Sequence, residues 1–340
     1  MRKHVISTIY QLVSPRTFST DFREIDDTTS VLIRPKYMSV CQADQRYMQG
    51  HRPQEVLRKK LPMALIHEAV GTVVLDRTGN YQVGQAVAMI PNIAGPGRPG
   101  IYENYTEGSR FLSSGYDGFM REIVDLPPDR VVAIPRADAQ TSLTELCSVS
   151  YHAIRRFEET SHDFRERIGV WGDGPVGYLT ATLLKHAYPE FHVSVIGRHS
   201  DKLAYFTLVD RRYVTEELPS EVRFDHVFEC TGGTGAENAV EQAIEHIRPQ
   251  GTIILMGVSE NPIDVDTRMV LEKGLTLVGA SRSGRVDFER AAQIWRDPHI
   301  ANQIGKIVYE DEPVRSIDDI FRAFNTDLVT PFKTAFKWEL

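Results

Sequence analysis

The chain has 340 residues and a formal net charge of -7 at neutral pH. A chain of this length usually folds into two domains rather than one. Hydrophobic residues make up 41% and charged residues 25%, without a low-complexity tract, which is typical of an ordinary globular protein. The acidic balance, without a basic stripe interleaved with aromatic residues, argues against a nucleic-acid-binding surface.

No targeting or membrane segment is evident. The stretch from Met1 to Pro15 has a short apolar run interrupted by Gln11, and no small-residue cleavage site follows, so we expect no signal peptide. A run of about 18 apolar residues, which a membrane span needs, does not occur. The cysteines, Cys41, Cys147 and Cys230, are too few and too scattered for a disulfide framework. We therefore expect a cytoplasmic protein without a membrane partner.

The first part of the chain, from Ser30 to about Pro135, is predicted to be rich in β-strands. Short apolar runs there are separated by Gly, Pro and Asn, which favour turns. One helical pattern stands out, from Gln54 to Lys60. The predicted strands include SVLIRP, GTVVLD, QAVAMIP and DRVVAIP.

The pattern changes at Thr141. Residues 141–159 carry apolar side chains at helical spacing, and RIGVWGDGPVGYLTATLLKHA then predicts a strand, a glycine turn and a helix. Further predicted strands alternate with helices, as expected for a parallel, doubly wound sheet. These strands are HVSVIG, DHVFECTG, GTIILMG and LTLVGAS.

The tail, residues 287–340, predicts an amphipathic helix near Phe288 to Trp295 and a final strand, KTAFKW, that returns to the β-rich part. The predicted fold class is α/β, with a β-rich catalytic domain and a Rossmann-type doubly wound sheet. We place the catalytic domain at residues 1–147 and 285–340, and the dinucleotide-binding domain at residues 148–284.

A glycine turn carries the clearest sequence signal for a dinucleotide. Gly172 permits a tight turn after the strand, Gly174 lets the backbone approach a pyrophosphate, and Gly177 lets helix and strand pack closely. Pro175 and Val176 open the helix, whose N–H groups attract phosphate. The alternative is a glycine turn with a purely structural role.

The end of the next predicted strand bears on the choice of nicotinamide cofactor. An acidic residue there would bind the ribose 2′-hydroxyl, but the sequence has Gly197, Arg198 and His199, with Lys202 one turn later. These cations favour NADP(H) over NAD(H), because they can bind a 2′-phosphate. The alternative is that Arg198 is a solvated surface residue.

Three residues suggest a metal site. Cys41 alone could be a small buried hydrophobe, and His67 with Glu68 could serve packing alone. Together a thiolate and an imidazole suit zinc, and a catalytic zinc needs three protein ligands with one open position. Glu145, just before the dinucleotide-binding part, is the candidate third ligand.

These residues resemble zinc-dependent medium-chain alcohol and polyol dehydrogenases over nearly the whole chain. The family's CGSD motif corresponds to residues 41–44, its GHE motif to 66–68, and its Glu-Pro-Leu ligand segment to 145–147, while DGFMREIV from Asp117 matches its GGF/Y-A-E-Y segment. The resemblance implies a GroES-like catalytic domain. It also implies zinc on Cys41, His67 and Glu145, with Glu68 as an alternate ligand and Asp44 behind the ligands.

Two departures from the family pattern matter. Many members carry four cysteines that hold a structural zinc, but the stretch from Asn92 to Tyr116 has none, so we expect a catalytic zinc alone. Ala43 stands where the family often has a Ser or Thr that passes a proton to solvent. A water chain, Glu68 or a substrate hydroxyl could serve instead, and the sequence leaves these routes open.

Longer phrases are similar to the ribulose-5-phosphate reductases, also called ribitol-5-phosphate dehydrogenases, which supply CDP-ribitol for teichoic acids or capsules. They include RPKYMSVCQADQRYMQG, KKLPMALIHE and LEKGLTLVGASRSGRVDF. The similarity implies NADPH-dependent reduction of D-ribulose 5-phosphate to D-ribitol 5-phosphate. It also implies a homodimer and functional coupling to a cytidylyltransferase. Gly257 and Ser281, after two predicted strands, are expected to contact the cofactor.

Three other functions remain open at this point: a polyol dehydrogenase for unphosphorylated substrates, a zinc-free reductase for enones or quinones, and a non-catalytic NADPH-binding protein. The sequence also does not single out the residues that would bind a substrate phosphate. The candidate cations are Arg46, Arg52, Lys60, Arg155, Arg156 and Arg282.

Overall fold

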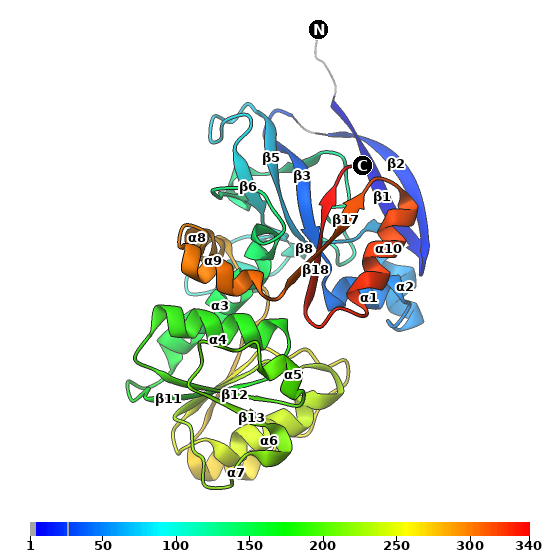
Figure 1. The fold of residues 1–340 in the computed structure, drawn as a ribbon. Coiled ribbons are helices and arrows are strands. Elements are labelled where there is room, and N and C mark those ends of the chain that lie inside the picture. Colours follow the sequence, from blue (N-terminus) through cyan, green and yellow to red (C-terminus); the bar gives the residue numbers. More distant parts are fainter. Residues whose placement is uncertain (1–4, 26) are drawn as a thin grey trace. The chain divides into compact units, whose positions relative to one another are not determined.

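A computed structural model describes residues 5–25 and 27–340 (Figure 1). The start of the predicted N-terminal segment, residues 1–4, lies outside the described residues. The chain divides into two compact units. Unit 1 comprises Met1–Ser148 with Ser283–Leu340, and unit 2 comprises Val149–Arg282.

Unit 1 is built on a seven-stranded sheet with strand order β10-β6-β5-β3-β18-β17, and β9 pairs with β3. A smaller sheet has the order β2-β1-β4, and β7 pairs with β8. The apolar runs that predict strands in residues 30–135 are confirmed. The strands are β1 (Val5–Ser14), β2 (Thr17–Ile25), β3 (Val31–Ser39), β4 (Met63–Ala64), β5 (Glu68–Asp76), β6 (Ala86–Met89), β7 (Asn92–Ile93), β8 (Arg110–Phe111), β9 (Val124–Leu126), β10 (Val131–Ala133), β17 (Val308–Val314) and β18 (Lys333–Trp338).

The returning strand KTAFKW is confirmed as β18, which pairs antiparallel with β3 and parallel with β17. Its register places Ala335 opposite Ser39. On the other side of β3, Ser39 is opposite Glu68, the first residue of β5. The register of three neighbouring strands therefore brings the end of β3, the start of β5 and the start of β18 together.

The helices of unit 1 include two groups that the sequence prediction missed. The first is α1 (Gln42–Met48), which lies before the predicted helix α2 (Gln54–Lys60). The second follows α8 (Arg285–Ile294) and consists of α9 (Pro298–Gly305) and α10 (Ile317–Asp327). In Figure 1, α10 lies against β17 and β18 and its buried face adds Ile320 and Phe324 to the main core of unit 1.

Unit 2 contains a six-stranded parallel sheet with strand order β13-β12-β11-β14-β15-β16. Strands such as β12, which is buried from Val193 to Gly197, consist mostly of apolar residues because helices cover both faces. Figure 1 shows α4 on one face and α6 and α7 on the other. The elements are α3 (Thr144–Thr160, which begins in unit 1), β11 (Arg167–Trp171), α4 (Pro175–Ala187), β12 (His192–Gly197), α5 (Ser200–Leu203), β13 (Arg211–Val214), β14 (His226–Glu229), α6 (Ala236–His246), β15 (Thr252–Leu255), α7 (Thr267–Lys273) and β16 (Thr276–Gly279).

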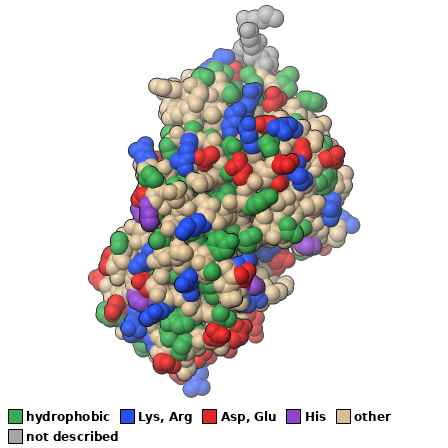
Figure 2. All heavy atoms as spheres, in the orientation of Figure 1, with side chains coloured by type: hydrophobic (Ala, Val, Ile, Leu, Met, Phe, Trp, Pro, Cys, Tyr) green, Lys and Arg blue, Asp and Glu red, His purple; other side chains and the backbone are tan. Residues whose placement is uncertain are grey.

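The surface carries charges of both signs. On the face drawn in Figure 2, Lys and Arg side chains are interspersed with Asp and Glu side chains rather than gathered in one stripe. In the part of the chain that the structure describes, every helix is too short or too polar to cross a membrane.

Candidate functional site

Cys41, His67 and Glu68 form a compact cluster in unit 1, with one ligand atom from each lying within 4.8 Å of the others. Cys41 caps the start of α1 with an extended backbone, and His67 directly precedes β5. His67 is 6% exposed and Glu68 is fully buried. A thiol, an imidazole and a carboxylate at such spacing are ligands that zinc accepts, so the donor set fits the zinc that the sequence predicts.

Asp44, on α1, lies behind His67 and is fully buried. Its Oδ1 accepts hydrogen bonds from Ser113 Oγ at 2.5 Å and from the Ile66 backbone N–H at 3.0 Å. Its Oδ2 lies 3.3 Å from His67 Nδ1, within the distance of an ion pair, and neither atom has another hydrogen-bond partner among the described residues. With Nδ1 facing a carboxylate, Nε2 is the nitrogen left for a metal.

These contacts fix the charges of the Asp44–His67 pair. Burial acts against the charged form of Asp44, but His67, Ser113 and Ile66 outweigh it and lower the pKa of Asp44. Burial likewise acts to lower the pKa of His67, but the charges of Asp44 and Cys41 raise it well above its usual value. The pocket behind the cluster therefore stabilises a carboxylate that holds the imidazole in place.

Glu68 is held by two donors. Ser39 Oγ donates to it at 2.5 Å, and Lys333 Nζ donates to it at 2.8 Å. Lys333 is 4% exposed and also donates to the Val40 backbone oxygen, next to Cys41. Because a buried carboxylate without a partner is costly, Lys333 explains how Glu68 can be fully buried as an anion. The sequence prediction missed Lys333, since it belongs to no ligand motif.

Glu145 lies in the first turn of α3 and is 4% exposed, but it is not part of the three-residue cluster. The net pKa of Glu145 is raised to about 7. Burial is the main cause and the charges of Glu68 and Asp44 add to it, whereas His67 and Lys333 act in the opposite direction. Glu145 is therefore close enough to the cluster for its charge to interact with the other groups. The structure brings Cys41, His67 and Glu68 together and leaves Glu145 beside them.

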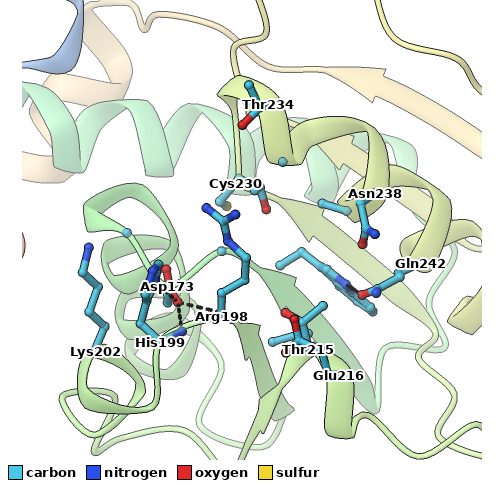
Figure 3. A pocket seen from close by; sticks show the side chains of 18 residues that line it. Asp173, Arg198, His199, Lys202, Thr215, Glu216, Cys230, Thr234, Asn238 and Gln242 are labelled. Carbon is cyan, nitrogen blue, oxygen red and sulfur yellow. Dashed lines mark hydrogen bonds and ion pairs between the residues drawn. The ribbon is translucent and has the colours of Figure 1, made fainter.

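A second site, in unit 2, is a pocket of about 350 Å³ at the carboxyl ends of the parallel strands (Figure 3). Five of the predicted cofactor residues line it, and they are Gly172, Gly174, Arg198, His199 and Lys202. In Figure 3 the Arg198 side chain lies in the middle of the pocket, between Asp173 and His199 on one side and Asn238 and Gln242 on the other.

Two positions of the glycine turn, Gly172 and Gly177, require glycine for steric reasons. Gly172 has a φ of +123°, and a Cβ on Gly177 would lie 2.0 Å from the Gly172 oxygen. Gly174 caps α4 and has open space around its Cα, which leaves room for a ligand to approach the backbone. Pro175 and Val176 occupy the first turn of α4, as predicted from the sequence, although neither lines the pocket.

Asp173 adds a carboxylate to the end of β12, where the sequence predicts only cations. Its Oδ2 accepts the backbone N–H groups of Arg198 and His199, both at 2.7 Å, and lies 3.0 Å from His199 Nδ1. A Cβ on Gly197 would lie 2.6 Å from Asp173 Cβ, so the carboxylate packs where only glycine fits. The sequence argument places cations alone at this strand end, whereas the structure adds a carboxylate from the glycine turn.

Besides Pro175, Val176 and Gly177 at the start of α4, two further predicted cofactor residues, Gly257 and Ser281, do not line the pocket. The Gly257 N–H donates to Glu229 Oε2 at 3.0 Å, and Ser281 is exposed after β16. The pocket instead includes residues that no motif marked. Thr215 and Glu216 follow β13, and Asn238 and Gln242 lie on α6. Ligands generally bind beyond the carboxyl ends of parallel strands, so a prediction of β13 would have indicated Thr215 and Glu216 as well.

Two sequence families match this chain. Residues 27–136 match the alcohol dehydrogenase GroES-like domain, and residues 139–331 match the glucose dehydrogenase C-terminus. The α/β fold class with a GroES-like part and a Rossmann-type sheet is thereby confirmed.

Similar proteins cover the whole length of the chain. The ribulose-5-phosphate reductase of Streptococcus pneumoniae is 51% identical over 100% of both chains, and that of Bacillus spizizenii is 44% identical over 99% of this chain and 100% of its own. The crystal structure of S. aureus TarJ in complex with NADPH is 42% identical, with a TM-score of 0.87, over 99% of this chain and all of that one. The chain therefore belongs to the zinc-dependent medium-chain dehydrogenases, in the group of the ribulose-5-phosphate reductases.

Proposed function

We propose that this protein reduces D-ribulose 5-phosphate to D-ribitol 5-phosphate with NADPH, at a zinc site in unit 1. The observation that carries the proposal is the thiol–imidazole–carboxylate cluster of Cys41, His67 and Glu68. It occurs in a chain that is 51% identical over its full length to a ribulose-5-phosphate reductase. The cluster argues for the zinc-dependent function over the zinc-free and non-catalytic alternatives.

When bound, zinc supplies a Lewis acid that polarises the C2 carbonyl group of the substrate. Cys41 and His67 are the proposed ligands, with Glu145 as the third and Glu68 as an alternate. Glu145 suits the third position because the oxygens of Glu68 already accept hydrogen bonds from Ser39 and Lys333. The role of Asp44 is to hold the His67 ring in orientation through Nδ1.

In unit 2, the backbone around Gly172, Gly174 and Gly177 and the first turn of α4 would bind the pyrophosphate of the cofactor. Arg198, His199 and Lys202 would bind the 2′-phosphate, which supports NADPH over NADH. Pro175 and Val176 shape the helix start. Gly257 and Ser281 stay proposed cofactor contacts, based on their positions after β15 and β16.

The product would supply CDP-ribitol for cell-wall teichoic acid or capsule through functional coupling to a cytidylyltransferase. We propose a homodimer, by resemblance to the family. We also place the reaction in the cytoplasm, because Cys41, Cys147 and Cys230 are all unpaired thiols.

The decisive measurement follows NADPH absorbance with ribulose 5-phosphate, xylulose 5-phosphate and unphosphorylated ribulose. We expect kcat/KM for ribulose 5-phosphate to exceed that for ribulose by on the order of 100-fold, since binding of a remote dianion can orient the ketone for reaction. NADH should support a lower kcat/KM than NADPH, and Arg198→Ala should reduce that difference.

Cys41→Ser tests the metal site, because it removes the sulfur ligand atom and changes the side-chain volume little. The variant should lose bound zinc and most activity. Two outcomes contradict the proposal: a higher kcat/KM for an unphosphorylated ketose, or full turnover by protein without metal.

A further inference from the structure

Positive charge gathers around one buried aromatic ring in unit 1. Arg52 Cζ lies 5.1 Å from the centroid of the Tyr47 ring, and Lys60 Nζ lies 5.9 Å from it. Tyr47 is only 2% exposed, whereas Arg52 and Lys60 are partly exposed. Two cations held near one ring repel each other, and an anion bound beside them would relieve that repulsion.

This basic cluster, defined by Arg52, Lys60 and Tyr47, is connected to the proposed zinc site through α1. Cys41 caps that helix, and Asp44 and Tyr47 follow at intervals of three residues, which places them on one side of the helix. Six residues of helix correspond to about 9 Å along the axis. The Tyr47 ring of the basic cluster is therefore about 9 Å along α1 from Cys41, one of the proposed zinc ligands.

A turn from Phe111 to Tyr116 forms a second connection. The Ser113 N–H donates to the Tyr116 oxygen and the Ser114 N–H to the Phe111 oxygen. Ser113 Oγ donates to Asp44, whereas Ser114 Oγ accepts from Lys60 Nζ at 2.8 Å. The turn thus contacts both sites: Ser113 binds Asp44 next to the proposed zinc ligands, and Ser114 binds Lys60 of the basic cluster.

Two residues of this turn, Ser113 and Gly115, have a left-handed backbone conformation. Ser113 has a φ of +63°, a conformation that costs energy for a residue with a side chain and persists where the surroundings enforce it. Gly115 has a φ of +90°, and a Cβ there would lie 3.3 Å from Lys60 Cγ. The turn therefore gives the stem of Lys60 space to lie against it. The Phe111 ring also meets the His67 ring edge-on at 5.3 Å, on the zinc-site side of the turn.

The hydroxyl of Ser114 is suited to binding an oxyanion. Because Ser114 Oγ accepts from Lys60, its own proton remains able to donate to a further acceptor. Lys60 has further N–H donors, and it forms no ion pair with a carboxylate in residues 5–25 and 27–340. A serine O–H, a lysine ammonium and an arginine guanidinium are all donors that a phosphate monoester accepts.

We infer that Lys60, Ser114 and Arg52 bind the phosphate group of the substrate. The inference rests on the proposed function, because that function supplies the phosphorylated ketose. It adds that a terminal phosphate monoester is recognised in unit 1, next to α1, by a set of residues separate from those proposed for the cofactor phosphates in unit 2.

Lys60→Ala in the zinc-loaded full chain tests the inference. We expect kcat/KM for ribulose 5-phosphate to fall by about 10- to 100-fold, as for the loss of one charged hydrogen bond. The value for unphosphorylated ribulose should change less than twofold, because that substrate has no group for Lys60 to bind. Arg52→Ala should show the same selectivity, and Lys60→Arg should retain part of the activity with the phosphorylated substrate.

Lys59→Ala is the matched control, because Lys59 is the exposed neighbour of Lys60 on α2 and its loss changes the net charge equally. Its kcat/KM for both substrates should stay close to that of the unmodified protein. If Lys60→Ala lost kcat/KM equally with both substrates, Lys60 would have a structural role. If Lys59→Ala lost as much kcat/KM for ribulose 5-phosphate as Lys60→Ala, the effect would be one of general charge. Either result overturns the inference.

A binding measurement separates this inference from the proposed function. Inorganic phosphate is titrated calorimetrically into protein saturated with NADPH, so that the cofactor's own phosphate sites are filled. We expect binding to the unmodified protein and to Lys59→Ala, and at least about tenfold weaker binding to Lys60→Ala. Absence of phosphate binding to the unmodified protein overturns the subsite. Phosphate binding that depends on Lys60, without turnover of ribulose 5-phosphate, would instead contradict the proposed function alone.

Discussion

His226, on β14, is a buried residue whose charge state bears on the stability of unit 2. Its Nδ1 accepts the Thr252 N–H and its Nε2 donates to the Phe164 oxygen, both at 3.1 Å, so the neutral ring satisfies both contacts. Burial lowers the pKa of His226 to about 4, and the neighbouring His162 adds to the effect. A protonated ring would lose its acceptor for Thr252.

The pH dependence of stability follows from this pKa. An unfolded histidine has a pKa of about 6.5, so between about pH 6.5 and 4 the unfolded chain binds a proton that the folded chain does not. Stability therefore falls as the pH is lowered through that window. We expect His226 to contribute about 2 kcal/mol to the decrease in the free energy of unfolding between pH 7 and 4.5, as measured by urea unfolding.

His226→Gln should remove this part of the pH dependence, because glutamine does not titrate. His299→Gln is the control, since His299 is exposed. Identical pH profiles for the unmodified protein and His226→Gln would contradict the prediction.

Single residues also show what the sequence could indicate about the zinc site. The sequence could indicate that Cys41, His67 and Glu68 belong to one candidate zinc site, because zinc restricts the side chains that bind it and the motifs lie in the same β-rich part. Lys333 could not, since it is 265 positions from Glu68 and no local pattern marks a buried ion pair. Ser114 likewise has a role only because a turn brings it to Lys60.

At the scale of elements, the turn between β11 and α4 allows a test with two glycines that differ in their surroundings. A Cβ at Gly177 would collide with the Gly172 oxygen, whereas Gly174 has open space. Gly177→Ala should therefore destabilise unit 2 by at least about 2 kcal/mol. Gly174→Ala should stay within about 0.5 kcal/mol of the unmodified protein but bind NADPH at least about tenfold more weakly, because its methyl group would lie where the pyrophosphate approaches.

Thermal unfolding together with NADPH titration distinguishes the two effects. If both variants lost stability alike, the steric argument at Gly177 would fail. Undiminished NADPH binding by Gly174→Ala would show that the pyrophosphate does not approach this turn.

The predicted and missed elements differ in their burial. Strands such as β11 and β12 could be predicted because their apolar runs are buried. In contrast, β13 begins with two exposed arginines and has no apolar run to mark it, so the pocket wall formed by Thr215 and Glu216 was missed with it. The helix α1 was missed because seven residues are too few for a helical period to stand out.

For the whole molecule, the metal and cofactor sites lie in different units. The residues proposed for zinc belong to unit 1, and the pocket with the glycine turn belongs to unit 2. Removal of zinc by a chelator should therefore abolish turnover while the Kd for NADPH changes less than about threefold, as expected for sites without a shared ligand. Zinc content by elemental analysis and NADPH fluorescence provide the two measurements. A large loss of NADPH affinity that zinc restores would show that the sites are coupled.

The order of strands around Glu68 has a consequence for the newly made protein. Unit 1 is discontinuous, and β18, which supplies Lys333, pairs with β3 from the other side of unit 2 in the sequence. At 5–20 residues per second, the ribosome needs roughly 13 to 53 s to proceed from Glu68 to Lys333. During that interval unit 2 can fold, but Glu68 lacks the cation that balances its charge. The ion pair between Lys333 and Glu68, next to the proposed metal site, therefore forms only after the cofactor pocket has been synthesised.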